Sequence, residues 1–136
     1  MTTICVVDDD QTLLDLVTEL LRERNWTMLA LRDGRGAGEI VRTAAPDAIL
    51  LDIRLDSDTS GWDVLDDLLA EPTTRSIPVI IWSADAKTLS ERRVWLHEAG
   101  VRVLAKPFEI DDLFRLLDEV LPEAYETLKP PSDRSA

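Results

Sequence analysis

The chain alternates short, continuously apolar runs with longer segments in which apolar residues recur every three or four positions. A short continuous run is typical of a strand buried on both faces of a sheet, whereas the longer period is typical of a helix with one buried face. The runs predict five strands, at Thr3–Val7, Trp26–Leu31, Ala48–Asp52, Ile77–Trp82 and Val101–Ala105.

Helical periodicity follows each predicted strand. Asp10 is placed to cap the first helix, Asp33 and Gly34 open the second, Gly61 starts the third, and the fourth spans about Asp85 to Ala99. The inward residues that the period predicts are, helix by helix, Leu13, Leu16, Val17, Leu20 and Leu21; Ala37, Ile40, Val41 and Ala44; Trp62, Leu65, Leu68 and Leu69; Leu89 and Leu96; and Ile110, Leu113, Phe114, Leu117, Val120 and Leu121. Five strands that alternate with five helices imply an α/β fold with a parallel sheet covered on both faces.

Length and composition favour one globular domain. A chain of 136 residues with 45% apolar residues can bury a core without disulfides, and its single cysteine, Cys5, allows no intrachain disulfide. No apolar run reaches the ~18 residues that a membrane span needs, and no signal-peptide pattern precedes the first strand. We expect a cytoplasmic protein in which residues 1–121 form the domain and 122–136 a short, frayed tail rich in Pro and Ser, with no effector domain.

The charge balance excludes some partners. The formal net charge is −12 and the pI is near 4.4, with no basic cluster, so most of the surface would repel nucleic acid. The acidity instead suits a metal cation, or a protein partner with a basic or apolar docking face.

Residues with chemical potential stand at the carboxyl ends of four predicted strands. Asp8 to Asp10 follow the first, Asp52 ends the third, Ser83 follows the fourth and Lys106 follows the fifth. Because open α/β sheets bind ligands at the carboxyl ends of their strands, these side chains are expected to share one crevice. Each residue alone has a plainer interpretation, such as a helix cap or a surface charge. The coincidence at four strand ends favours a common site.

The residue types indicate a metal and phosphoryl site. Carboxylates held close together at neutral pH repel one another and need a cation, and Mg²⁺ takes oxygen ligands from one or two carboxylates, water and phosphate. A carboxylate can attack phosphorus in line if the charge on the phosphoryl oxygens is neutralised. A lysine ammonium and a serine hydroxyl suit that task. The product would be an acyl phosphate on an aspartate.

At this point a family resemblance is evident. Over about Thr2 to Leu121 the chain resembles the receiver domain of bacterial two-component response regulators, of the single-domain, chemotaxis-regulator-like type. The resemblance rests on four stretches in order, Val6-Val7-Asp8-Asp9-Asp10, Ile49-Leu50-Leu51-Asp52-Ile53-Arg54, Pro78-Val79-Ile80-Ile81-Trp82-Ser83-Ala84 and Ala105-Lys106-Pro107-Phe108. It implies a flavodoxin-like (βα)5 fold with a five-stranded parallel sheet in the order 2-1-3-4-5.

The resemblance also implies a metal site. Asp52 would accept a phosphoryl group from a phosphohistidine, in a reaction that depends on Mg²⁺. Asp9 and Asp52 would ligate the metal together with the backbone carbonyl of Arg54, and Asp8 would act mainly through a bound water.

Further roles follow for the strand-end residues. Lys106 would pair with the phosphoryl oxygens, and Ser83 would turn towards them as the switch residue. The Lys106–Pro107 bond matches one that is cis in the family. Ala84 matches a small residue that leaves room for the phosphoryl group.

Three departures from the family pattern stand out. Val103 occupies the position where the family usually has an aromatic residue that turns inward on activation. The loop after Asp52 lacks the family's usual proline and is one residue longer than usual. Arg54 and Asp85 place opposite charges two residues after the acceptor and two after the switch residue, where they would pair across the phosphoryl group and hinder attacking water.

As a receiver, the chain would be no conventional enzyme but a phosphoacceptor that catalyses its own phosphorylation and dephosphorylation. Its partners would be a sensor histidine kinase or histidine phosphotransfer protein and a downstream protein target. The signal would pass through the face formed by the fourth helix, fifth strand and fifth helix, with the protein a monomer or weak homodimer.

Two alternatives remain. The stretch from Asp8 to Thr12 also fits the signature of haloacid-dehalogenase-type phosphatases, with Asp8 as nucleophile and Asp10 as acid/base. That reading needs an acid pair at a later strand end, whereas Asp111 and Asp112 open a helix. The other alternative is a receiver fold that acts as a docking module without phosphorylation.

Overall fold

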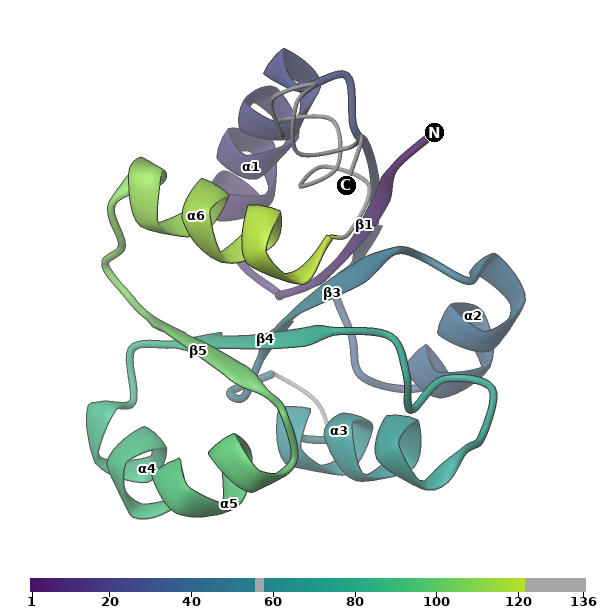
Figure 1. The fold of residues 1–136 in the computed structure, drawn as a ribbon, viewed down its shortest axis with the longest axis vertical. Helices are drawn as coiled ribbons and strands as arrows, with labels where there is room; N and C mark the ends of the chain where they lie inside the picture. Colours follow the sequence, from purple (N-terminus) through teal and green to yellow (C-terminus); the bar gives the residue numbers. More distant parts are fainter. Residues whose placement is uncertain (56–57, 122–136) are drawn as a thin grey trace, which may run out of the picture.

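The computed structural model describes residues 1–55 and 58–121. Five strands form one parallel sheet: β1 (Thr3–Val7), β2 (Thr27–Leu31), β3 (Ala48–Asp52), β4 (Val79–Ser83) and β5 (Arg102–Ala105). The helices are α1 (Gln11–Glu23), α2 (Ala37–Ala44), α3 (Gly61–Ala70), α4 (Ala86–Glu91), α5 (Arg93–Glu98) and α6 (Ile110–Val120). Figure 1 shows α1 and α6 on one side of the sheet and the other helices on the opposite side.

The strand order is β2-β1-β3-β4-β5, which confirms the flavodoxin-like topology expected from the sequence. Along β3 and β4, Asp52 is paired with Trp82, and along β4 and β5, Ser83 is paired with Ala105. This register brings the last residues of three neighbouring strands to one edge of the sheet. The predicted strand from Ile77 begins two residues later, at Val79, because Pro78 has no N–H to donate to a neighbouring strand.

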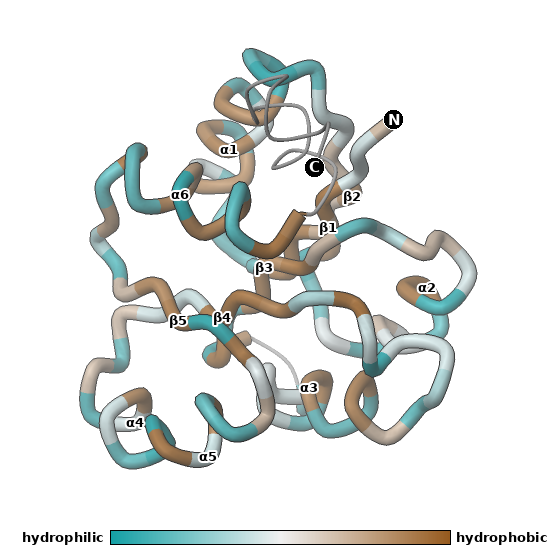
Figure 2. The backbone as a smooth tube through the Cα atoms, in the orientation of Figure 1, coloured by the Kyte–Doolittle hydropathy of each residue, from teal (hydrophilic) through white to brown (hydrophobic). Residues whose placement is uncertain are grey.

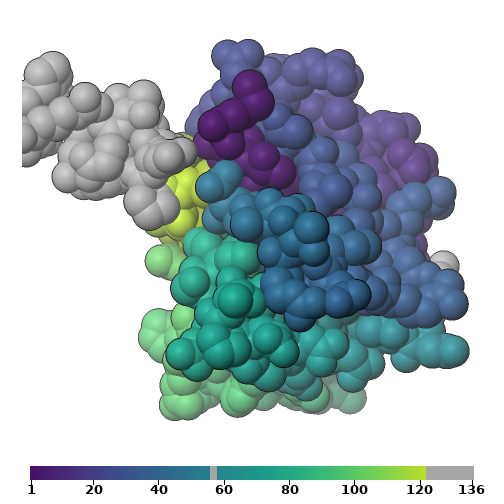
Figure 3. Space-filling view, turned by 90° about the vertical axis from the view of Figure 1, so that its right-hand side faces the viewer, coloured from purple at the N-terminus to yellow at the C-terminus, as the bar shows by residue number. Residues whose placement is uncertain are grey.

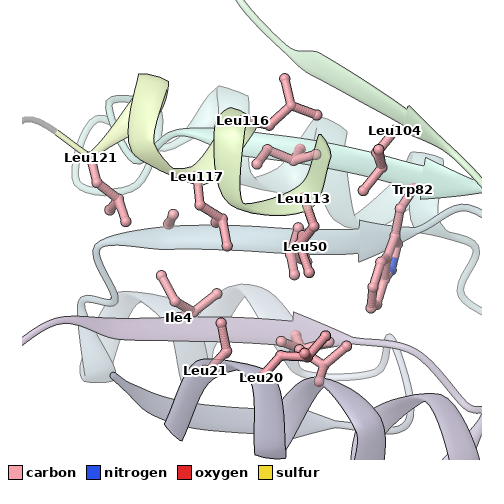
Figure 4. Packing of buried hydrophobic residues seen from close by; sticks show 14 of the residues in the cluster. Ile4, Leu20, Leu21, Leu50, Trp82, Leu104, Leu113, Leu116, Leu117 and Leu121 are labelled. Carbon is pink, nitrogen blue, oxygen red and sulfur yellow. The ribbon is translucent and has the colours of Figure 1, made fainter. Parts of the chain in front are cut away.

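The sheet has a hydrophobic core on each face because successive residues of a strand point to opposite sides. In β1, Ile4 and Val6 pack beneath α1 and α6, whereas Cys5 and Val7 pack beneath α2, α3, α4 and α5. Figure 2 shows the hydrophobic strands between helices of mixed hydropathy, and Figure 4 shows the core beneath α1 and α6. In the space-filling view of Figure 3, the blue segment that contains α2 lies above the teal segment that contains α3.

Some predicted inward residues are wrong. In α1, Val17, Leu20 and Leu21 are buried as predicted, but Leu14 is buried without having been predicted and Leu16 is 46% exposed. Ile40 of α2 and Ile110 of α6 are also exposed. Helix α2 starts at Ala37 rather than at Asp33 and Gly34, because the intervening residues form a turn that ends at Gly36 with a positive φ of 70°.

The predicted fourth helix is two helices, α4 and α5, separated at Arg92. The backbone of Arg92 (φ −104°, ψ 8°) leaves the helical region, although hydrogen bonds from Arg92 N to Thr88 O and from Leu96 N to Arg92 O cross the junction. The predicted inward residues Leu89 and Leu96 are both buried, one on each helix. Two anchors seven positions apart hold the segment to the sheet without enforcing one straight helix.

Two predictions fall outside the described residues. They are the frayed tail over 122–136 and part of the loop after Asp52, at positions 56 and 57. Within the described ranges, none of the helices has both the length and the apolar character needed to cross a membrane.

Candidate metal and phosphoryl site

Three carboxylates meet at the carboxyl edge of the sheet. Asp8 and Asp9 follow β1 and Asp52 ends β3, and one oxygen from each lies within 4.8 Å of the others. Asp8 is fully buried and Asp52 is 7% exposed, whereas Asp9 is more accessible. The sequence prediction that these acids come together is therefore supported by their geometry, and an all-oxygen set of this kind suits Mg²⁺.

Lys106, at the far end of the chain, brings its ammonium group to the same place. Its Nζ lies 2.6 Å from Asp8 Oδ2 and 3.5 Å from Asp52 Oδ2, and its side chain is only 19% exposed. The Lys106–Pro107 peptide bond is cis, as the family resemblance implied. The ammonium thus stands between the two buried carboxylates.

Local hydrogen bonds orient the acids. Asp10 N donates to Asp8 Oδ1 at 2.9 Å, and Asp10 itself caps α1 by accepting from Thr12 N and Leu13 N, so its predicted cap is confirmed. Arg54 N donates to Asp52 Oδ1 at 3.2 Å. One oxygen of each buried carboxylate is therefore held by the backbone, while the other faces Lys106.

Gly61 allows α3 to begin directly against the end of β3. Its N–H donates to Ile53 O at 2.9 Å, and a Cβ at this position would lie 2.1 Å from Asp52 O. Since real Cβ atoms do not approach so closely, only glycine fits here. The glycine that marked the start of the third helix thus lets α3 begin in direct contact with the end of β3.

Burial raises the pKa of Asp52 above its ordinary value. The Lys106 charge opposes this shift and the nearby Asp8 charge adds to it, but desolvation is the largest cause. Burial therefore disfavours the ionised form of Asp52, and a cation at this site would favour it.

Ser83 ends β4 beside β3, the strand that carries Asp52. It is buried, its Oγ accepts a hydrogen bond from Asp85 N at 3.0 Å, and its carbonyl oxygen accepts from Lys106 N at 2.8 Å. Ala84 follows it and is exposed. The hydroxyl thus stands between the end of β4 and the cap of α4.

Arg54 and Asp85 form the ion pair that their charges suggested. Arg54 donates from Nη2 and Nε to Asp85 Oδ2, at 3.0 and 3.3 Å. Asp85 also caps α4 by accepting from Thr88 N and from the Thr88 hydroxyl, and these hydrogen bonds are the main reason that its pKa is lowered. The pair joins the loop after β3 to the start of α4.

Val103 lies on the edge strand β5, 38% exposed. An aromatic pair lies elsewhere, where Trp62 of α3 and Trp95 of α5 meet edge to face with ring centroids 6.5 Å apart. The Arg92 guanidinium lies 4.3 Å from the centroid of the Trp62 ring. The start of α3 is therefore in contact with the junction between α4 and α5.

Trp82 was not predicted to take part in the site, yet its ring lies 4.9 Å from Lys106 Nζ. Strand alternation could have indicated this, because Trp82 is paired with Leu104 and Leu104 stands two residues before Lys106. Asp111 and Asp112, in contrast, lie in the first turn of α6 and not at a strand end. The acid pair that the phosphatase alternative requires is absent from that position.

Comparisons with known proteins agree with this geometry. Residues 4–118 match the family model described as the response regulator receiver domain. The chain is 33% identical over 119 residues to the probable transcriptional regulatory protein TcrX of Mycobacterium tuberculosis, covering 88% of this chain and 49% of TcrX. It is 27% identical to the polar-differentiation response regulator DivK of Brucella anthropi, covering 89% of this chain and 97% of DivK.

A solved structure is similar as well. The receiver domain of the sensor histidine kinase PA1611 from Pseudomonas aeruginosa, with a magnesium ion coordinated in its active-site cleft, superimposes with a TM-score of 0.76. It is 28% identical, and the match covers 88% of this chain and 97% of that one. The chain spans about half the length of TcrX but nearly all of DivK.

Proposed function

Because this chain belongs to the family of response regulator receiver domains, we propose that it is a switch that accepts a phosphoryl group on Asp52. The donor is the phosphohistidine of a sensor kinase or of a phosphotransfer protein. The observation that carries the proposal is the position of Lys106 Nζ, 2.6 Å from Asp8 and 3.5 Å from Asp52. It places a positive charge beside the acceptor carboxylate.

In the transfer, a carboxylate oxygen of Asp52 forms a bond to phosphorus while the bond from phosphorus to the imidazole nitrogen breaks. The departing nitrogen keeps the electron pair, and the product is an acyl phosphate. Lys106 neutralises charge on the phosphoryl oxygens, and the Ser83 hydroxyl turns from Asp85 N to donate to one of them. Ala84 leaves space above the acceptor.

Receiver domains bind Mg²⁺ at this acidic site, and the described residues fit the ion, since three carboxylate oxygens lie within 4.8 Å of one another. We expect Asp9, Asp52 and the carbonyl of Arg54 to hold it, with Asp8 acting through water. When bound, the ion neutralises charge on the carboxylates and phosphoryl oxygens.

The output surface that we propose is the face of α4, α5, β5 and α6. It exposes apolar side chains, with Val94 64%, Trp95 41% and Val103 38% exposed, to which a protein partner can bind. Contact between Trp62 and Trp95 links this face to the start of α3, which directly follows the acceptor loop. Four further points stay predictions: the identity of the partner, the oligomeric state of this protein (a monomer or weak homodimer), the domain limits of 1–121 and the cytoplasmic location.

The test is the intact mass after incubation with Mg²⁺ and acetyl phosphate. We expect a labile gain of one phosphoryl group in the wild type and none in Asp52→Asn. A gain that persists in Asp52→Asn but is lost in Asp8→Asn, with steady phosphate release, would instead support the phosphatase alternative. No gain from acetyl phosphate or from any histidine kinase tried would support a docking module.

A further inference from the structure

The indole of Trp82 lies beside the ammonium group on which the proposed transfer depends. Lys106 Nζ is 4.9 Å from the centroid of the Trp82 ring, and Trp82 has no exposed surface. The ring of Phe108, two residues after Lys106, also lies near this indole, with ring centroids 5.8 Å apart. Figure 4 shows the indole at the arrowhead end of the strand that carries Leu50, which is the edge where the acids gather.

An aromatic face attracts a cation through its quadrupole, and the attraction grows when water is excluded. The Lys106 side chain is 19% exposed and the ring is fully buried, so water shields this contact little. The indole N–H contributes nothing comparable, because Nε1 is buried and has no hydrogen-bond acceptor among residues 1–55 and 58–121. The face of the ring, and not its polar edge, is therefore what Trp82 offers to the site.

We propose that Trp82 is a positioning residue for Lys106, an inference that rests on the proposed function. Asp8 and Asp52 also attract the ammonium. A carboxylate whose charge is shared with a bound cation attracts the ammonium less. The indole has no net charge and no metal-binding atom, so its attraction persists when Mg²⁺ is bound and leaves the N–H groups of Lys106 available to phosphoryl oxygens.

The contact can be observed without any phosphorylation. The sequence contains three lysines, so ¹³C-lysine labelling gives a simple NMR spectrum that a Lys106→Met variant assigns. We expect the ε protons of Lys106 to be shifted upfield by the ring current of Trp82, relative to the exposed Lys87, both without and with Mg²⁺. The upfield shift should vanish in Trp82→Leu. Its absence in the wild type, or its loss on addition of Mg²⁺, would overturn the proposal.

The functional test keeps the shape of the site. Replacing tryptophan by mono-, di- and trifluorinated tryptophan weakens the ring quadrupole with little change in volume, so folding is preserved. We expect the maximal rate of Asp52 phosphorylation by acetyl phosphate, at saturating Mg²⁺, to fall progressively by about two- to fivefold across the series. The same series in Trp82→Phe, which fluorinates only the other three tryptophans, should show no trend.

The outcomes separate the two proposals. If unfluorinated protein takes no phosphoryl group on Asp52, the proposed function fails, while the NMR shift still tests the contact. If the protein is phosphorylated but fluorination leaves the rate unchanged, or changes it equally in Trp82→Phe, only the positioning role fails.

Discussion

At Asp52, burial and nearby charge act in opposite directions. The pKa of this carboxyl is raised above its ordinary value of 3.8, mainly by desolvation, although Lys106 favours the ionised form. A raised pKa means that the unfolded chain releases the proton first as pH rises. As pH rises from the ordinary pKa through the pKa of the folded state, ionisation of Asp52 therefore lowers the free energy of unfolding. The free energy of unfolding stays lower at neutral pH.

Asp52→Asn should consequently stabilise the metal-free protein. We expect a free energy of unfolding at pH 7 higher by on the order of 1 kcal/mol, measured by urea unfolding in the presence of a chelator. The advantage should shrink as pH falls towards the ordinary pKa, where the wild-type carboxyl is protonated in both states. Asp66→Asn, which alters an exposed acid of α3, is the matched control and should change little. Equal or lower stability of Asp52→Asn at pH 7 would contradict the prediction.

The pair of Arg54 and Asp85 gives a second prediction at this scale. The ion pair, with a separation of 3.0 Å, spans from the loop after Asp52 to the start of α4. On the proposed function, it would obstruct water that attacks the phosphoryl group on Asp52. Replacing both residues by alanine should shorten the lifetime of the acyl phosphate by about two- to fivefold, as fits an exposed pair. The lifetime is measured by loss of the phosphorylated mass after removal of the donor.

A second variant distinguishes the effect of losing the ion pair from the effect of losing the helix cap. Asp85 also caps α4 through Thr88, so its loss disturbs the helix as well as the pair. Arg54→Ala alone removes the pair and keeps the cap, and it should reproduce most of the shortened lifetime. An unchanged lifetime in both variants would show that the pair does not affect dephosphorylation.

At the scale of elements, the junction between β3 and α3 depends on the absence of a side chain at Gly61. A Cβ there would lie 2.1 Å from Asp52 O and 2.5 Å from Ile53 Cα, and both are backbone atoms that cannot yield easily. We expect Gly61→Ala to lower the free energy of unfolding by about 1–3 kcal/mol, as overpacking does, and to slow phosphorylation by displacing Asp52. Circular dichroism during urea unfolding and the mass assay measure the two effects.

Gly38 of α2 supplies the contrast. A Cβ there would meet only Asp67 Cβ, at an ordinary 3.8 Å. Gly38→Ala should therefore be neutral or stabilise the protein by about 0.5–1 kcal/mol through helix propensity. If both alanine variants behaved alike, the close approach at Gly61 would not be the reason for its glycine.

The strands and their end residues could be predicted because each apolar run stops at a polar residue, and parallel strands align those stops at one edge. The break at Arg92 could not be predicted. It accompanies stacking of Arg92 on Trp62, a residue of another helix, which no local pattern encodes. The contact between Trp82 and Lys106 was missed although strand alternation places the two residues on the same side of the sheet, because alternation does not give the path of a long, flexible side chain. In α1, both Leu13 and Leu14 fit the period of the buried residues that follow them, and only Leu13 was predicted, so Leu14 was missed.

At the scale of the whole molecule, charge repulsion works against folding. The net charge of −12 arises from 27 acidic and 15 basic residues, and three of the acids are gathered at one edge of the sheet. Any salt should stabilise the fold by screening. Binding of Mg²⁺ only to the folded state stabilises that state further, by mass action.

Thermal unfolding in MgCl₂ and in NaCl of equal ionic strength separates these two contributions. At a Mg²⁺ concentration ten times its Kd, binding should add ~1.4 kcal/mol, which corresponds to a rise in Tm of roughly 4–6 °C above the NaCl value. Asp9→Asn should abolish this difference, because Asp9 belongs to the acidic cluster, while Asp66→Asn, with the same change in net charge, should retain it. Equal Tm values of the wild type in the two salts would mean that salt only screens the charges of the acidic edge and that Mg²⁺ does not bind there specifically. A difference that survived in Asp9→Asn would place the ion away from Asp9.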